Sequence, residues 1–229
     1  MIKEFLVALF LLPVLVVSQE NSFESSGDTN YLEDQFYLGV NYNFMLEKPQ
    51  DVFKRNFSYG LQIGLIKDLP LNNSRTIALG LGLGYAVNSY YSNLIVTHEN
   101  DVISYYAESD ASLYKRSKFE MHSIEVPFEF RWRNSSPSKY KFFRIYSGVK
   151  FTYNFSARSK LVTDTDRDGF SNPDLERLQY GLTLNFGYNT FNLHLYYSLS
   201  DFLKKDTLLD TGEVITIKPF RVGLIFYVL

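Results

Sequence analysis

Six charged side chains recur at alternate positions of two neighbouring aromatic-rich segments, and their types suit ion pairing inside a protein. Alternate residues of an extended chain point to the same side, so each segment would present its charges on one face. Opposite charges on neighbouring strands can pair and hydrogen-bond across the ladder. The pattern predicts either a packed, ion-paired interior or a charged conduit. Its members are Glu125, Glu129, Arg131, Arg133, Arg144 and Lys150.

An acidic stretch later in the chain resembles the opening of an EF-hand calcium loop. Three aspartates at alternate positions precede Gly169, and such oxygen ligands with a glycine at the sharp turn suit a hard cation. Leu175 stands where such a loop has a bidentate Glu, so the match is partial and a solvated acidic loop is the alternative. The hypothesis is weak calcium binding, the only cofactor that the sequence suggests, by Asp164, Asp166, Asp168 and Asp174.

The histidines form no coherent catalytic group with a nucleophile. His122 and Ser123 are adjacent, and adjacent residues of a strand face opposite sides. A nucleophile and its base must lie within hydrogen-bond reach, so this pair does not meet the requirement. We interpret His194 as a hydrogen-bonded filler on a polar strand face, and we expect a protein that is not an enzyme.

Eight segments that alternate between apolar and polar residues must position these side chains. A period of two over about ten residues is the strand signal, and about ten residues is the span of a tilted transmembrane strand. Seven of the segments have one apolar and one polar face, and the last is predicted to be apolar on both. They cover residues 36–44, 57–65, 77–87, 124–132, 143–155, 178–188, 191–199 and 220–229.

The connections between these segments alternate strictly between long and short. Outer-membrane barrels have long loops outside the cell and short turns in the periplasm, and an even number of strands puts both termini in the periplasm. The predicted fold is therefore all-β, an eight-stranded antiparallel up-and-down transmembrane β-barrel.

The polar faces argue against a soluble barrel of the same size. A soluble barrel would bury the apolar faces and could not hold so many unpaired charges inside. In a membrane barrel the polar faces line an interior just wide enough for side chains, which favours a packed lumen over a channel. Gly80, Gly82 and Gly84 would make room there for Arg and Tyr side chains that reach across, and Pro127 predicts a local bulge.

Composition excludes several other classes of protein. The 23 basic and 25 acidic residues give a net charge of −2, which does not favour nucleic-acid binding. The absence of Cys rules out disulfides and thiolate metal sites, and 17% aromatic residues do not suit a disordered chain. Residues 1–18 read as a secretory signal peptide. Residues 19–34 read as a flexible periplasmic arm, and the barrel would occupy 35–229.

Three stretches resemble the PorT-like outer-membrane β-barrel family of Bacteroidota, also called a "porin family". They read SIEVPFEFRWR from Ser123, YKFFRIYSGVKFTYNF from Tyr140 and LQYGLTLNFGYNTFNLHLYYSLSDFL from Leu178. The resemblance implies a small barrel in the outer membrane of a Gram-negative bacterium, and some members look like parts of the type IX secretion and gliding machinery. It supplies no catalytic residues. Leu229 departs from the terminal aromatic residue that is usual for barrel assembly.

The expected function is that of a non-enzymatic scaffold or accessory subunit of an envelope secretion or assembly complex. Its expected partners are outer-membrane lipid and other outer-membrane or periplasmic proteins, with no nucleic acid. Two alternatives stay open: a narrow pore for small solutes, and a surface receptor that binds through the long extracellular loops.

Overall fold

A computed structural model describes residues 34–110, 112–134, 142–189 and 191–228. The predicted signal peptide, and the predicted arm up to residue 33, lie outside these residues. No helix in the described ranges is long and apolar enough to cross a membrane. The strands are β1 (Asp34–Leu46), β2 (Tyr59–Pro70), β3 (Ile77–Ser92), β4 (Leu94–Glu99), β5 (Val102–Ala107), β6 (Arg116–Arg133), β7 (Phe143–Val162), β8 (Arg167–Ser171), β9 (Leu178–Tyr188), β10 (Phe191–Ser198) and β11 (Lys218–Val228).

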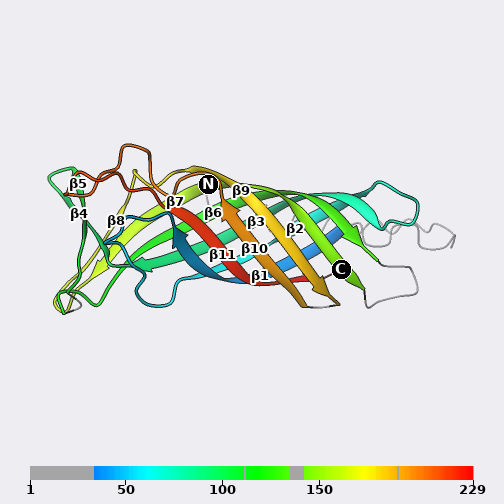
Figure 1. The fold of residues 1–229 in the computed structure, drawn as a ribbon, viewed down its shortest axis with the longest axis horizontal. Coiled ribbons are helices and arrows are strands. Elements are labelled where there is room, and N and C mark those ends of the chain that lie inside the picture. The colour runs from blue at the N-terminus through cyan, green and yellow to red at the C-terminus, as the bar shows by residue number, and fades with distance from the viewer. Residues whose placement is uncertain (1–33, 111, 135–141, 190, 229) are drawn as a thin grey trace, which may run out of the picture. The chain divides into compact units, whose positions relative to one another are not determined.

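Eight of these strands form a closed antiparallel barrel. Their order around the wall is β6-β3-β2-β1-β11-β10-β9-β7, and the pairing of β6 with β7 closes the ring (Figure 1). The first and last strands pair along their length, from Phe36 opposite Val228 to Leu46 opposite Lys218. The predicted eight-stranded up-and-down barrel is therefore confirmed. Strand β8 pairs antiparallel with the last five residues of β7, and β4 and β5 form a separate hairpin.

The two ends of the barrel differ in their connections. At one end, which we call the turn end, β2 joins β3, β6 joins β7 and β9 joins β10 through short connections, and β1 starts where β11 finishes. At the other, the loop end, the connections are long and contain β4, β5 and β8. The predicted alternation of long and short connections is confirmed.

Alternation along the strands gives the wall near the turn end two different faces. Outward side chains such as Leu83 and Phe151 are 62% and 55% exposed, while their chain neighbours point inward. We call this outward band the apolar belt. It includes Phe36, Leu38, Val40, Leu61, Ile63, Leu65, Leu81, Leu83, Ile124, Phe128, Phe130, Trp132, Phe143, Ile145, Phe151, Tyr153, Tyr180, Leu182, Leu184, Phe186 and Leu224.

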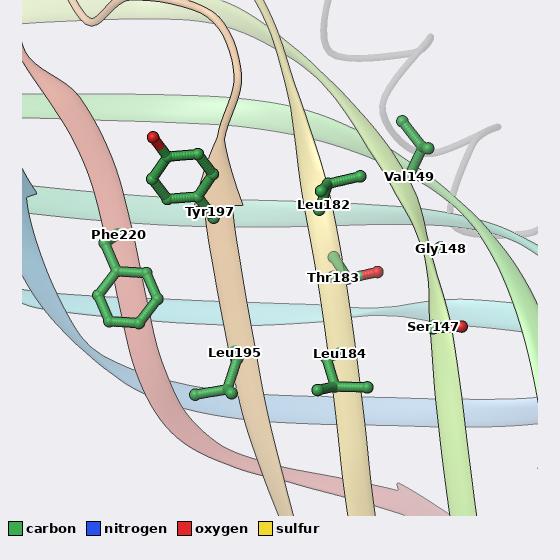
Figure 2. Close-up of a pocket in the computed structure, with 9 residues that line it drawn as sticks. All are labelled: Ser147, Gly148, Val149, Leu182, Thr183, Leu184, Leu195, Tyr197 and Phe220. Atoms are coloured by element: carbon green, nitrogen blue, oxygen red, sulfur yellow. The ribbon is translucent and has the colours of Figure 1, made fainter.

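An open groove on the outside of the wall shows this alternation directly. Its volume is about 520 Å³, and side chains of β7, β9, β10 and β11 line it. In Figure 2, Leu182 and Leu184 stand on one side of β9 and Leu195 stands beside them on β10. Thr183 lies between the two leucines, points the other way and is buried. Grooves of this apolar kind suit lipid chains.

Several strands are longer than predicted at the loop end, and the predicted bulge is in a different place. The register between β6 and β7 shifts between His122 and Ser123, where Phe155 is the extra residue of β7. At Pro127 the prediction was wrong: β3 and β6 keep one register on both sides of it. A proline removes one backbone donor, and here that loss is tolerated without an inserted residue.

The long connections fold into a compact cap over the loop end. The β4–β5 hairpin and the connections between β1 and β2, between β8 and β9 and between β10 and β11 bury apolar side chains together with the ends of β1, β3, β6 and β7. We call this cluster the loop-end core. Its buried members are Met45, Val52, Tyr90, Leu94, Val96, Tyr105, Phe119, Met121, Ala157, Leu175, Phe202, Leu203, Leu209, Ile215 and Ile217.

Candidate functional site

The six charged residues predicted to share one face all lie inside the barrel. Their exposure runs from 0% for Glu125 to 7% for Arg144. Strands β6 and β7 are neighbours in the wall, and their inward positions bring these side chains together in one narrow interior. The structure thus unites Glu125, Glu129, Arg131, Arg133, Arg144 and Lys150, as the alternation predicts.

Glu125 is the centre of one half of this network. Its carboxylate accepts hydrogen bonds from Lys150 Nζ at 2.8 Å and from Arg221 Nη1 at 3.0 Å. Lys150 Nζ also donates to Gln62 Oε1 at 2.7 Å, so this cation joins β7 to β2 across the interior. Ionic hydrogen bonds of this kind are short and strong, and they hold opposite walls of the barrel together.

Asp68 is the centre of the other half, nearer the turn end. Both Arg131 and Arg133 donate to its carboxylate, one to each oxygen. The Nε of Arg131 lies 3.4 Å from Glu129 Oε2, and its guanidinium lies 3.9 Å from the ring centroid of Tyr146. Stacking on an aromatic ring and pairing with carboxylates both compensate an arginine for its lost water.

Arg144 lies at the turn end of the same interior and has a different environment. Its Nη2 donates to the backbone oxygen of Asn189 at 3.0 Å. Its guanidinium lies 4.6 Å from the ring of Phe142 and 5.6 Å from that of Tyr227. The aromatic rings and one carbonyl thus hold this cation where the barrel opens toward its turns.

Asp68 and Arg221 are two members of the network that sequence reasoning missed. The predicted second segment ends at residue 65, but β2 continues to Pro70 and Asp68 keeps the inward position that Gln62 has earlier in the strand. We predicted the last strand to be apolar on both faces, which is wrong because Arg221 is buried in the interior. Arg221, Gly223 and Ile225 are alternate residues of β11, the strand between β1 and β10, and so share one face. This spacing could have identified Arg221 as an inward residue.

Glycines of β3 make room for the large side chains, as predicted. A Cβ at Gly80 would lie 2.7 Å from Arg131 Cδ, and a Cβ at Gly84 would lie 2.0 Å from Tyr37 Oη. Side chains at these two positions would overlap with groups that cross the interior. The small residues therefore decide where Arg131 and Tyr37 can lie.

The loop-end core closes the same interior above the charged network. Phe119 and Met121 point inward from β6 and are fully buried, six and four residues from Glu125 toward the loop end. Phe202 packs edge-on against Tyr90 and Phe119, with ring centroids 5.0 and 5.3 Å away. Arg221 Nε donates to Tyr90 Oη at 3.1 Å, which joins the apolar layer to the charged one.

The four aspartates of the calcium hypothesis have separate surroundings. Asp164 pairs with Lys115 Nζ at 2.9 Å, and Asp166 accepts from the backbone nitrogen that follows it at 2.7 Å. Asp168 lies within β8, and Asp174 accepts from a tyrosine hydroxyl at 2.9 Å. Within the described ranges, no group of three or more His, Cys, Asp or Glu side chains could hold a metal ion. Calcium binding stays a prediction that this geometry does not support.

The histidines lie apart from one another. His122 points outward and its Nδ1 lies 2.6 Å from Tyr85 Oη, while Ser123 points inward and donates to Asn154 Oδ1 at 2.6 Å. The predicted opposite orientation of this pair is confirmed. His194 is buried and bonds to the amide of Asn185, which agrees with its interpretation as an interior filler.

The barrel with its apolar belt and charged interior defines a β-barrel membrane protein. Residues 17–204 match the family "Outer membrane protein beta-barrel domain", and the chain belongs to that family. It is therefore an outer-membrane protein. The match does not extend to the PorT-like group, which stays a prediction.

Two solved structures of Ail, the attachment invasion locus protein of Yersinia pestis, are similar to this chain. One of them holds the heparin analogue sucrose octasulfate. Each is 14% identical, with a TM-score of 0.38, over 86% of this chain and 98% of theirs. No curated protein matches the chain.

Proposed function

We propose that the protein is a non-enzymatic, non-conducting outer-membrane scaffold, an accessory subunit of an envelope secretion or assembly complex. The main support for the proposal is that two layers of side chains fill the interior. Charged side chains cross the barrel near the turn end, and an apolar core fills it at the loop end. A solute path would have to break both layers.

The two layers differ in what would be needed to open them. Opening the charged layer separates Glu125 from Lys150 and Arg221, which leaves buried charges without partners and is costly. Opening the apolar layer exposes residues such as Phe119 and Phe202 to water. Both changes are unfavourable at once, which supports a closed barrel over a narrow pore.

The cap at the loop end supports a binding role. It is a folded unit with its own core, so its surface is held in a defined shape. Apolar side chains stand exposed on it, among them Val102 at 62% and Leu113 at 60%. Exposed apolar side chains on a rigid surface suit contact with another protein. A type IX secretion-like partner is the one that the PorT-like resemblance implies.

Planar-bilayer conductance tests the closed barrel. We expect the purified full chain to give no steady channels, and Glu129→Gln to give none either. Steady channels of defined size in the wild-type protein would overturn the proposal and favour the narrow pore. A change of their conductance in Glu129→Gln would then place the path through the charged layer.

Site-specific crosslinking in the native membrane tests the scaffold. A photoreactive residue at Val102 or Leu113 should trap one defined protein partner, while the same residue at Leu83 in the apolar belt should trap none. Crosslinks to a soluble extracellular ligand would favour the receptor alternative. Absence of any crosslinked protein at both cap positions would contradict a scaffold that works through the cap.

A further inference from the structure

A basic patch lies on the outer wall of the barrel, on the loop side of the apolar belt. Outward positions of β6 and β7 change there from apolar to charged, because the outward series that holds Ile124 continues upward through Glu120 and Lys118. We define the basic patch as Arg116, Lys118, Arg158 and Lys160, with Glu120 among them.

The cations of the patch are held close together. Lys118 lies opposite Lys160 and Glu120 lies opposite Arg158 in the β6–β7 ladder. Like charges directly opposite each other destabilise a sheet, so the arrangement calls for an anion. Glu120 supplies one, and it accepts hydrogen bonds from Lys118 Nζ at 2.5 Å and from Lys160 Nζ at 2.6 Å.

Glu120 cannot neutralise the patch. Its carboxylate already accepts hydrogen bonds from Lys118 and Lys160, and its single negative charge faces four positive ones. The patch keeps a net positive charge, with two half-buried lysines whose positions are already fixed.

The position of the patch relative to the belt identifies the depth at which it lies in the membrane. Tyr85, His122 and Phe155 cluster outward directly below it: Tyr85 Oη lies 2.6 Å from His122 Nδ1, and the rings of Tyr85 and Phe155 are 6.2 Å apart. Amphipathic rings of this kind gather where hydrocarbon meets lipid headgroups. The next outward residues toward the loop end, Glu120 and Lys118, then lie among the headgroups.

Two other charges at the loop-side edge of the wall have a polar neighbour. Lys218 Nζ pairs with Asp201 at 2.7 Å beside β11, and Glu47 accepts a hydrogen bond from Tyr197 at 2.8 Å between β1 and β10. On β6 and β7, by contrast, four cations accompany a single carboxylate, that of Glu120.

We propose that the basic patch binds the phosphate group of a membrane lipid headgroup. Lys and Arg pair with phosphate oxygens through charge-assisted hydrogen bonds, and basic residues at the membrane surface attract anionic lipids. A phosphate between the cations would relieve the repulsion that Glu120 leaves. The inference rests on the outer-membrane location of the family and does not depend on the scaffold role.

Vesicle binding with defined lipids tests the proposal. The full chain is folded into vesicles of a neutral, phosphate-free galactolipid that contain diphosphorylated lipid A, chemically dephosphorylated lipid A, or phosphatidylglycerol, and native mass spectrometry counts the lipid that stays bound. We expect retention of phosphate-bearing lipid and loss of retention when the phosphates are removed. Preference for lipid A identifies the glycolipid as the source, and preference for phosphatidylglycerol identifies a phospholipid.

Two variants keep the test decisive. Arg116→Gln/Arg158→Gln leaves the Glu120 pairs intact and should weaken retention roughly tenfold or more. Lys118→Gln/Glu120→Gln/Lys160→Gln removes the paired centre and should weaken it as well. The matched control, Lys204→Gln/Lys205→Gln, removes two exposed positive charges from the cap and should leave retention unchanged.

Three results would overturn the proposal. Equal retention of dephosphorylated lipid A would show that phosphate is not what is recognised. Equal loss in the Lys204 and Lys205 control would show that only total charge matters. Competition by free inorganic phosphate or by a soluble anionic polysaccharide, with no lipid retained, would assign the patch to a soluble anion.

Discussion

The interior of the barrel is filled in opposite ways at its two ends. Near the turn end the inward residues of β6 include Glu125 and Arg131, and the outward ones include Phe128. Toward the loop end the same strand turns Phe119 inward and Lys118 outward. One strand therefore inverts its pattern without changing its register to β3.

The surroundings of the wall explain the inversion. Where lipid lies outside, outward side chains must be apolar, and the polar ones are placed in the interior, where they need partners. Where water lies outside, the hydrophobic effect sends apolar side chains inward, as in a soluble protein. The charged layer therefore depends on pairing and the cap depends on packing, and each can be tested by itself.

The largest effect should follow from breaking the charged layer. Glu125→Ala removes the carboxylate that Lys150 and Arg221 share, and leaves two buried cations. We expect a loss of about 3–5 kcal/mol in the free energy of unfolding, measured by urea titration in lipid vesicles. The exposed Asp210→Ala should change it by less than about 0.5 kcal/mol. A small loss in Glu125→Ala would mean that water reaches the layer.

The loop-end core should respond to a packing change instead. Leu94→Ala removes a fully buried side chain from this core and should destabilise the cap by about 3 kcal/mol. Because the barrel below has its own network, we expect protease cleavage within the cap while the barrel stays folded. Leu113→Ala, at a residue 60% exposed, is the matched control. Simultaneous unfolding of cap and barrel would show that the two layers form one unit.

A smaller loss of stability should follow from filling the space beside a glycine in the charged layer. Gly84→Ala would place a Cβ 2.0 Å from Tyr37 Oη and 2.9 Å from the backbone oxygen of Ile63. We expect a cost of about 1–3 kcal/mol in the same urea titration. At Gly169 the nearest atom to a Cβ is Lys160 Cγ at 3.2 Å, so Gly169→Ala should cost less. Equal costs would contradict the tight interior.

The smallest effect should come from an ion pair exposed to water. Lys67 Nζ lies 3.6 Å from Asp34 Oδ1, and both side chains are largely exposed. We expect Asp34→Asn to cost under about 1 kcal/mol, and high salt to remove even that difference. The cost of Glu125→Ala should change far less with salt, because buried pairs are screened less. Equal salt dependence of the two would place Glu125 in contact with bulk water.

The sequence alone predicted the barrel and most of its interior. Alternation is a local property, so the inward and outward faces of β1, β6 and β9 could be assigned from residue types. The six predicted interior charges lie where the pattern puts them. The order of long and short connections predicted an up-and-down barrel. In such a barrel, segments that follow one another along the chain pair in the wall.

Only the tertiary structure decided which charges pair and where the apolar interior begins. Asp68 is an isolated acid next to a turn in the sequence, and its meeting with Arg131 and Arg133 depends on strands brought together by the closed ring. The loop-end core joins Leu94, Phe119 and Phe202 from three different connections or strands. These contacts are non-local, and no periodic pattern within one segment can encode them.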